Sequence, residues 1–319
     1  MATTPPRIVT LTLNPAVDFV STAAALRATH KIRTHDEHVD PGGGGVNVAR
    51  VVHALGGETL AVLAGGDVTG RFLCELLAAA GVPHHCVPIA GRTRVSFTVR
   101  ESTTGLEYRF VPEGPALSEP EWRRALAALP AVPGDYVVAS GSLPRDVPVG
   151  IYAEAARMAA SRGQAFVLDT SGPALAAALG HGITLLKPSL RELETLVGHA
   201  LPDAAAAERE ALALVRAGAA RIVVVTLGAA GAILASETGV LRRPAPATEV
   251  HSAVGAGDAF LAAMVLALAR GAAPEEALDW GLAAGAAAIA GIGTARITRS
   301  AVEHGYDALR ASRAARPAP

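Results

Sequence analysis

The stretch "GGGGVNVARVVHALGGETLAVLAG", residues 42–65, contains one complete unit of a helix followed by a strand. Glycines open the unit, and apolar residues then recur at helical spacing, namely Val46, Val48, Val51, Val52 and Leu55. A Gly-Gly pair ends the helix. The run "TLAVLAG" at 59–65 is continuously apolar, as is typical of a strand buried on both faces. The stretch predicts a helix packed against a parallel sheet.

The same alternation of strand and helix continues along most of the chain. Strand-like runs include "RIVTLTLN" (7–14), "DYVVASG" (135–141), "AFVLDTS" (165–171), "ITLLKPS" (183–189) and "RIVVVTLG" (221–228). Segments rich in Ala, Leu and Glu separate them. This pattern predicts an α/β fold with a doubly wound, mostly parallel sheet and helices on both of its faces.

Two segments interrupt the alternation. Residues 19–40 and about 92–111 are strand-like with no helix between the strands, and Thr104-Gly105 is a turn signal in the second. We expect both to form a small β-sheet lid, inserted into a single α/β domain that spans residues 1–319. Such a lid can close over a substrate, and its exposed edges can pair with a second subunit.

Composition excludes several classes of partner. The formal net charge is −1, which argues against broad electrostatic binding to nucleic acid or anionic lipid. The longest apolar stretch, 280–295, is shorter than the ~20 residues that span a bilayer. Only two cysteines occur, Cys74 and Cys86, without metal-like spacing, so we expect a cytoplasmic protein with small-molecule partners.

The segment "VGAGDAFLAAMVLAL" (254–268) places an aspartate, Asp258, at the start of an apolar helix. The backbone amides of Gly255, Ala256 and Gly257 can form an anion site there, backed by the helix dipole. Asp258 then stands beside that anion as a functional carboxylate. The alternative is an ordinary acidic residue in the first helical turn.

A second glycine-rich segment, "PGGGGVNVAR" (41–50), superficially suggests a dinucleotide-binding fingerprint. That interpretation is weak, because no strand is predicted immediately before it and Asn47 stands where the third glycine belongs. The amides and Asn47 can instead face a polyhydroxylated ligand, with Asp18 accepting hydrogen bonds from neighbouring hydroxyls. A tight turn before a capped helix is the structural alternative.

Taken together, six motifs resemble the ribokinase-like (PfkB) carbohydrate kinases in order and spacing, over residues 7–300. They are "TLTLNPAVD" (10–18), "PGGGGVNVAR", "SGSLP" (140–144), "LLKPS" (185–189) followed by Glu192, "VVVTLG" (223–228) and "VGAGDAF" (254–260). The first motif resembles the hexose-phosphate branch. The second, with "TLGAAGA" (226–232), is most similar to the minor bacterial type of ATP-dependent 6-phosphofructokinase.

The resemblance implies a role for each matching residue. Asp258 is the catalytic base, and the Gly255, Ala256 and Gly257 amides hold developing negative charge. The sugar is bound by Asp18, Gly43, Gly44 and Asn47, and its phosphate by Lys31, Arg33 and Arg94. Lys31 and Lys187 are the only lysines beside 26 arginines, which favours point-charge roles for both.

On the nucleotide side, the resemblance implies that Lys187, Ser189, Thr226 and Gly228 face ATP and that small residues around 283–287 flank the adenine. Ser189 departs from the family's Asn-x-x-Glu pattern, and Glu192 is implied to act on Mg²⁺ through water. The resemblance leaves a K⁺ requirement open and implies a homodimer formed through the lid.

The activity implied is transfer of phosphate from ATP to fructose 6-phosphate, giving fructose 1,6-bisphosphate. Fructose 1-phosphate and tagatose 6-phosphate kinases share nearly every motif and stay open as alternatives. A sugar-phosphate sensor without turnover is an alternative of another class, and a dinucleotide oxidoreductase has only the flawed glycine match in its favour.

Overall fold

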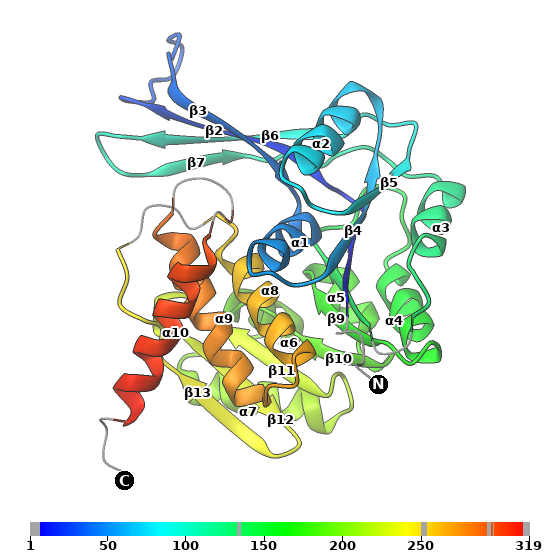
Figure 1. The fold of residues 1–319 in the computed structure, drawn as a ribbon, viewed down its shortest axis with the longest axis vertical. Helices are drawn as coiled ribbons and strands as arrows, with labels where there is room; N and C mark the ends of the chain where they lie inside the picture. The colour runs from blue at the N-terminus through cyan, green and yellow to red at the C-terminus, as the bar shows by residue number, and fades with distance from the viewer. Residues whose placement is uncertain (1–6, 133–134, 250–253, 292–294, 296, 315–319) are drawn as a thin grey trace.

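The computed structural model describes residues 7–132, 135–249, 254–291, 295 and 297–314. Nine strands form the larger sheet: β1 (Ile8–Thr12), β4 (Thr59–Gly65), β5 (His84–Pro88), β8 (Tyr136–Ser140), β9 (Ala165–Asp169), β10 (Ile183–Leu186), β11 (Ile222–Thr226), β12 (Ala232–Ser236) and β13 (Gly239–Arg243). Their order is β13-β12-β11-β10-β9-β8-β1-β4-β5 (Figure 1). Seven strands, from β5 to β11 in that order, run parallel, and β12 and β13 add an antiparallel edge.

The strand order reverses at β1. From β1 the chain first builds outward to β4 and β5, then returns to the other side of β1 with β8 and continues to β13. Ligands of open α/β sheets bind beside the carboxyl ends of the strands at such a switch point. The strand order therefore predicts a site at the carboxyl ends of β1, β8 and β9.

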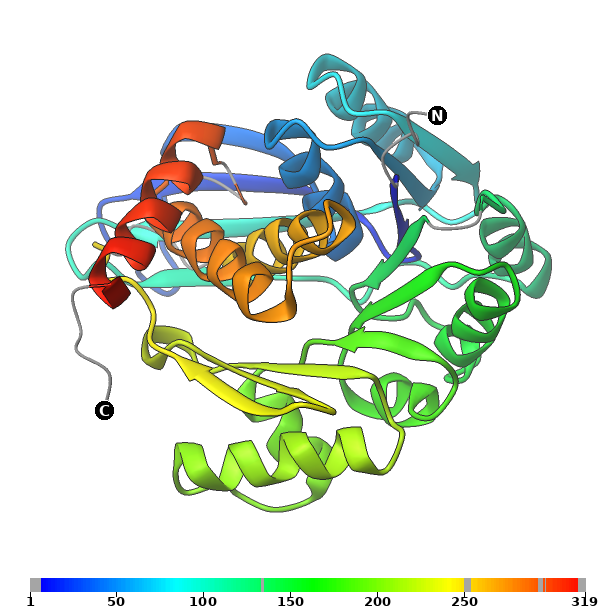
Figure 2. The ribbon, with the colours of Figure 1, turned by 60° about the horizontal axis from the view of Figure 1, so that its bottom comes forward.

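Helices cover both faces of the sheet, as predicted (Figure 2). They are α1 (Gly44–Ala54), α2 (Asp67–Ala79), α3 (Glu119–Ala127), α4 (Ile151–Ser161), α5 (Gly172–Ala178), α6 (Leu190–Val197), α7 (Ala204–Arg216), α8 (Ala256–Ala269), α9 (Pro274–Ile289) and α10 (Arg299–Ala314). Within β11, Val224 packs in the core cluster of α1, α8 and α9, whereas Val223 and Val225 pack in that of α3, α4 and α7. Both faces are apolar, which explains the continuous apolar runs of the sequence. None of the helices within the described ranges is long and apolar enough to cross a membrane.

A second sheet of four strands confirms the predicted lid strands, with different bounds. It contains β2 (Ala16–Ala23), β3 (His35–Gly42), β6 (Arg94–Glu101) and β7 (Glu107–Phe110) in the order β3-β2-β6-β7 (Figure 1). Gly105 has a φ of 73° in the turn between β6 and β7, where a turn was expected. Residues 24–34, which had been predicted within a strand-like segment, connect β2 to β3 without strand structure.

Polar and apolar residues alternate across the small sheet. Ser96 and Thr98 are buried, whereas Phe97 between them is 50% exposed. Asp18 lies opposite Ser96 in the register of β2 and β6, so it shares the buried polar face. The lid therefore has a polar face with Asp18, Ser96 and Thr98, whereas Val17, Phe19 and Val95 on its other face pack with α1 and α2.

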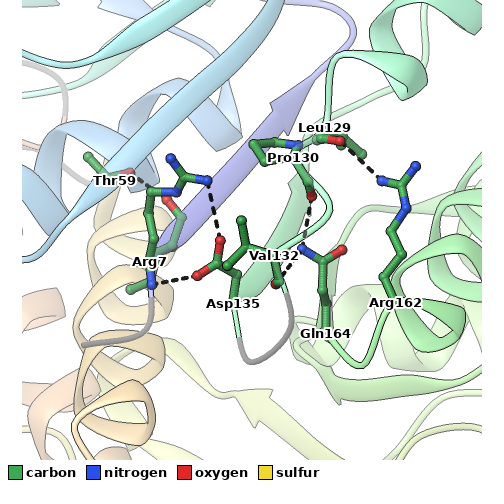
Figure 3. Close-up of polar contacts among 9 residues, drawn as sticks. Arg7, Thr59, Leu129, Pro130, Val132, Asp135, Arg162 and Gln164 are labelled. Carbon is green, nitrogen blue, oxygen red and sulfur yellow. Dashed lines mark hydrogen bonds and ion pairs between the residues drawn. The ribbon is translucent and has the colours of Figure 1, made fainter. Parts of the chain in front are cut away.

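A partly buried ion pair joins the residues just before β1 and β8, at the amino ends of these two strands (Figure 3). The Arg7 backbone N–H donates to Asp135 Oδ1 at 2.9 Å, and its Nη2 donates to Oδ2 at 3.4 Å. Beside it, Gln164 Nε2 donates to the carbonyls of Pro130 and Val132 (Figure 3). These contacts serve the fold and lie away from the candidate site.

Candidate active site

Asp258 lies in the first turn of α8, whose apolar residues are buried on every side of the helix. Gly255 caps the helix with a φ of 78°, a conformation that suits glycine, and a Cβ on it would lie 2.7 Å from Ala295. The Asp258 carboxylate, Oδ2, accepts a hydrogen bond from Asn47 Nδ2 at 2.9 Å. Two predicted site residues that are far apart in sequence therefore meet.

The electrostatic surroundings make Asp258 a suitable proton acceptor near neutral pH. Burial, followed by the nearby Asp169 carboxylate, raises the pKa of Asp258 to about 7, against the Asn47 hydrogen bond and the positive charge of Lys187. A general base is most effective when its pKa lies near the working pH. Asp258 is thus both a first-turn acid of α8 and a buried carboxylate with a raised pKa.

Lys187 contributes a buried cation next to the α8 N-terminus. Its Nζ lies 3.0 Å from Asp169 Oδ1, and a Cβ built on Gly257 would lie 3.6 Å from the same Nζ. Burial disfavours the lysine charge, but Asp169 outweighs it and the pKa of Lys187 is raised. An ammonium group and the amides that begin α8 thus converge on one point, as binding of an anion requires.

Close backbone approach explains the glycine run before α1. A Cβ on Gly44 would lie 2.2 Å from Ser140 Oγ, and one on Gly42 would lie 2.1 Å from Asp18 Oδ2. Gly43 has a φ of 108°. The expectation that no strand precedes this run is wrong, because β3 leads directly into α1. However, β3 belongs to the small sheet and pairs antiparallel with β2, so the segment still differs from a dinucleotide-binding βαβ unit.

Asp18 and Arg94 form the other side of the site, on the polar face of the lid. Arg94 Nη2 donates to the Asn14 carbonyl at 2.8 Å and Nη1 to the Pro112 carbonyl at 3.0 Å. Its buried Nε has no hydrogen-bond partner among the described residues. Burial raises the pKa of Asp18, and Ser96, Arg109 and Arg94 counteract it. Positive charge and an unsatisfied donor here suit an anionic group of a ligand.

Lys31 and Arg33 lie far from Asp18 and Arg94 in the structure. Both side chains are exposed on the 24–34 connection, at the end of the lid opposite Arg94. From Asp18 to Ala23, β2 extends five more residues, or about 16 Å at ~3.3 Å per residue. Within one chain the structure therefore does not bring Lys31 and Arg33 to Arg94.

Ser189 and Glu192 cap α6. Glu192 Oε2 accepts from the Ser189 N–H at 2.7 Å, and Ser189 Oγ accepts from the Glu192 N–H at 3.3 Å. Ser189 also forms a bridge to Thr226, and Gly228 begins the short turn that follows β11. Glu192 is thus a capping glutamate as well as a carboxylate near Lys187. The described part of the chain contains no group of three or more His, Cys, Asp or Glu residues that could hold a metal.

A cavity of about 830 Å³ lies between α9, the segment 244–248 and α10, and it is lined mainly by small and apolar residues. Its walls include Ala283, Ala286 and Ala287 of α9, the segment Pro244–Thr248, and Gly305 of α10. The small residues predicted near 283–287 to flank a nucleotide base therefore do border a cavity. Its size and apolar lining suit a planar heterocycle.

Asp169 and Arg109, which lie in or beside the site, were not among the predicted site residues, and Ser140 was named only as the first residue of the motif "SGSLP". Asp169 is the last residue of β9, and an acidic residue at the carboxyl end of a buried parallel strand was a signal that could have identified it. Ser140 ends β8 in the same way. Arg109 lies on the short β7 and carried no local signal.

The chain is similar to known proteins along almost its whole length. The profile of the "pfkB family carbohydrate kinase" matches residues 11–300. "ATP-dependent 6-phosphofructokinase isozyme 2" of Mycobacterium tuberculosis is 43% identical over 95% of this chain and 89% of its own. A "1-phosphofructokinase" of Rhodobacter capsulatus is 34% identical over 83% of this chain and 84% of its own.

Solved structures of one bacterial protein are similar along nearly the whole chain. Phosphofructokinase-2 from Escherichia coli in complex with potassium superposes with a TM-score of 0.91 and 36% identity, covering 96% of this chain and 99% of that one. The same protein in complex with fructose-6-phosphate gives a TM-score of 0.89 at 35% identity, with the same coverage.

Proposed function

The chain belongs to the pfkB family of carbohydrate kinases, and from this we propose that it transfers the γ-phosphoryl group of ATP to fructose 6-phosphate, giving fructose 1,6-bisphosphate. The single observation that carries the proposal is the meeting of Asp258, Asn47 and the Lys187–Asp169 pair at the amide-lined start of α8. A proton acceptor, an oriented amide and an anion site are the parts that phosphoryl transfer to an alcohol needs.

In the proposed reaction, Asp258 accepts the proton of the sugar hydroxyl as that oxygen attacks the γ-phosphorus. A carboxylate cannot deprotonate a free alcohol in advance, so the proton moves late, when the new oxygen–phosphorus bond makes the hydroxyl acidic. The pKa of Asp258 near 7 suits this role better than an ordinary aspartate would. The bond to the β-phosphate oxygen breaks and ADP leaves.

Charge on the transferred group is held by Lys187 and by the amides of Gly255, Ala256 and Gly257. These donors are fixed by α8 and by the ion pair with Asp169, so they need no rearrangement during the reaction. Mg²⁺ bound with ATP would neutralise phosphate charge. We assign Glu192 as the candidate acid for the water on that ion, which would be held mainly by phosphates and water.

On the sugar side, we assign Asp18 and Asn47 to hydroxyl groups and Arg94 to the phosphate of the substrate. The half-buried guanidinium of Arg94 is held by two backbone carbonyls, which fixes its position before substrate binds. A free hexose would leave this cation unpaired, so the site selects a phosphorylated sugar. Thr226 and Gly228, at the end of β11, are assigned to the ATP side, and the cavity beside Ala283 to the adenine.

The lid favours a homodimer. Phe19, Phe97 and Phe110 lie opposite one another across β2, β6 and β7, and the Phe19 and Phe97 rings stack with centroids 5.5 Å apart. Phe97 and Phe110 are 50% and 59% exposed in one chain. A row of exposed aromatic rings on a sheet marks an association surface. A second copy of this face would cover it, and Phe97→Asp should yield a monomer in light scattering.

One panel experiment tests the proposed reaction. Purified protein with ATP and Mg²⁺ would be given fructose 6-phosphate, fructose 1-phosphate, tagatose 6-phosphate and the free hexoses, with ADP release measured for each. The highest kcat/KM for fructose 6-phosphate is expected. A preference for fructose 1-phosphate would instead favour the activity named for the Rhodobacter relative. Binding without ADP release would support a sensor.

The same panel would be run in K⁺ and in Na⁺, because the E. coli relative was solved with potassium.

A cytosolic location is part of the proposal, since both cysteines are free thiols and thiols persist in reducing compartments.

A further inference from the structure

Arg50 contacts the end of the Asn47 side chain that faces away from Asp258. Helix α1 places the two residues one turn apart, and Arg50 Nη1 donates to Asn47 Oδ1 at 3.3 Å. The same Nη1 donates to the Pro41 carbonyl at 3.1 Å, and Nη2 donates to Asp40 Oδ1 at 3.3 Å. Asn47 is thus held between a guanidinium and the Asp258 carboxylate.

The chemistry of these partners fixes the orientation of the amide. A guanidinium only donates hydrogen bonds, and an ionised carboxylate only accepts them. Asn47 satisfies both when its oxygen faces Arg50 and its NH₂ group faces Asp258. A flipped amide would place its oxygen against the carboxylate and its NH₂ against the guanidinium, losing both hydrogen bonds.

Arg50 is itself held in place by burial and by the lid. Its side chain is 13% exposed and that of Asp40 only 4%. Asp40 belongs to β3 and lies opposite Asp18 in the register of β2 and β3. The Asp40–Arg50 ion pair therefore joins the base of the lid to the helix that carries Asn47.

We propose that Arg50 is a positioning residue for phosphoryl transfer, which fixes the Asn47 amide so that its NH₂ group holds Asp258 Oδ2 and leaves Oδ1 to receive the proton of the sugar hydroxyl. This inference rests on the proposed role of Asp258 as the base. Arg50 acts through Asn47 and does not contact the reacting atoms.

Removing the guanidinium has a defined electrostatic consequence. The Asn47 hydrogen bond stabilises the charged form of Asp258 and lowers its pKa. The other charged groups that act on Asp258 are Asp169 of β9, Lys187 after β10 and Asp18 of β2. Loss of Arg50 should therefore raise the pKa of Asp258 and move the acid limb of the kcat profile to higher pH.

The test compares the wild type with Arg50→Met, which keeps most of the side-chain volume, and with Arg50→Lys, which keeps the charge. The Asp258 carboxylate would be titrated by ¹³C NMR without substrates, with Asp258→Asn for assignment, and kcat would be measured from pH 5.5 to 9. We expect an upward shift of about one pH unit for Arg50→Met and a smaller one for Arg50→Lys. Well below the pKa, a one-unit shift lowers the active fraction of enzyme about tenfold, with KM for the sugar phosphate changed less.

Two controls separate positioning from general destabilisation. Arg7→Met removes a partly buried arginine from the ion pair with Asp135 at the far edge of the sheet, and it should lower stability without moving the pH profile. In an Asn47→Ala background, Arg50→Met should cause no further shift, because its effect passes through Asn47.

The proposal would be overturned if both Arg50 variants kept the wild-type pKa of Asp258 and the wild-type pH profile of kcat. It would also be overturned if Arg50→Met shifted the Asp258 pKa by the full amount in the Asn47→Ala background. If Arg50→Met does not fold, Arg50→Lys decides, because an ammonium group lacks the planar fork of the guanidinium and should leave the pKa of Asp258 higher than in the wild type. Absence of kinase activity in the wild type would count against the proposed function, while the substrate-free NMR titration would still decide the role of Arg50.

Discussion

Replacing Gly44 with alanine tests whether the glycine run exists to let α1 approach the end of β8. The new Cβ would lie 2.2 Å from Ser140 Oγ and 3.0 Å from both the Gly141 nitrogen and the Ser140 carbonyl carbon. Gly44 is the first residue of α1 and its φ is not in the left-handed region, so the backbone itself tolerates alanine. The cost of this substitution is therefore steric.

The magnitude follows from these distances. Ordinary contacts of a Cβ lie at about 3.4–4 Å, so the start of α1 must move by roughly 1 Å or Ser140 must rotate away, which costs about 1–3 kcal/mol of stability as in other overpacked sites. The melting temperature should fall by roughly 2–8 °C. Asn47 is three residues further along α1, and a misplacement of about 1 Å near a reacting group can lower kcat about 10²-fold.

The assay measures Tm by calorimetry, and kcat and KM by coupled ADP release. Gly150→Ala is the matched control, because Gly150 has an ordinary φ of −81° and no atom within 4 Å of the added Cβ. In the double variant with Ser140→Ala, which removes the clashing Oγ, Tm should partly recover. If Gly44→Ala keeps the wild-type Tm and kcat but raises KM for the sugar, then Gly44 makes room for the sugar ring, and the packing argument is refuted.

Further predictions concern the residues that bind and react. Asp258→Asn should lower kcat by ~10²- to 10⁴-fold, the usual contribution of a general base, with substrate binding nearly intact; unchanged turnover would remove Asp258 from the reaction. In the wild type, the Asp258 pKa of about 7 predicts that kcat/KM falls as the pH drops below 7, because protonation removes the base; a profile flat to pH 5 would contradict this. Arg94→Met should raise KM for the sugar phosphate by about 10- to 100-fold, because a charged hydrogen bond contributes ~1.5–3 kcal/mol. Lys31→Ala should raise KM less in one chain, because Lys31 is exposed at the far end of the lid. Equal increases in KM would place both residues at the phosphate. Ser189→Asn should tighten Mg²⁺ dependence if the shorter serine limits the metal's water shell; an unchanged metal titration would show that the capping arrangement of Ser189 is sufficient.

Part of the site could be predicted because its signals are local. Asp258 behind the Gly255–Gly257 amides needs only a glycine turn and an apolar helix, both visible in the sequence. The partners of Asp258 could not be predicted in this way. Asn47 lies 211 residues away, and its contact depends on α1 and α8 packing side by side on one face of the sheet.

The lid shows the same division. Its strand-like segments and the turn at Gly105 were visible as a period of two and a turn dipeptide. The register that sets Asp18 opposite Ser96, and the separation of Lys31 and Arg33 from Arg94, depend on how four strands pair. A shift of one residue would move every side chain to the other face, so pairing rather than composition decides which charges meet.

The sequence alone determined the alternation of buried strands and helices, the glycine-framed start of α8 and the two lid segments, because turn chemistry and hydrophobic periodicity act over neighbouring residues. Only the tertiary structure decided that Asp169 pairs with Lys187, that Asn47 holds Asp258, and that Asp40 of the lid pairs with Arg50. Those contacts join elements whose neighbours are set by the strand order around β1 and by the burial of both sheet faces. The packing of the whole domain stabilises these contacts, and no single segment forms them on its own.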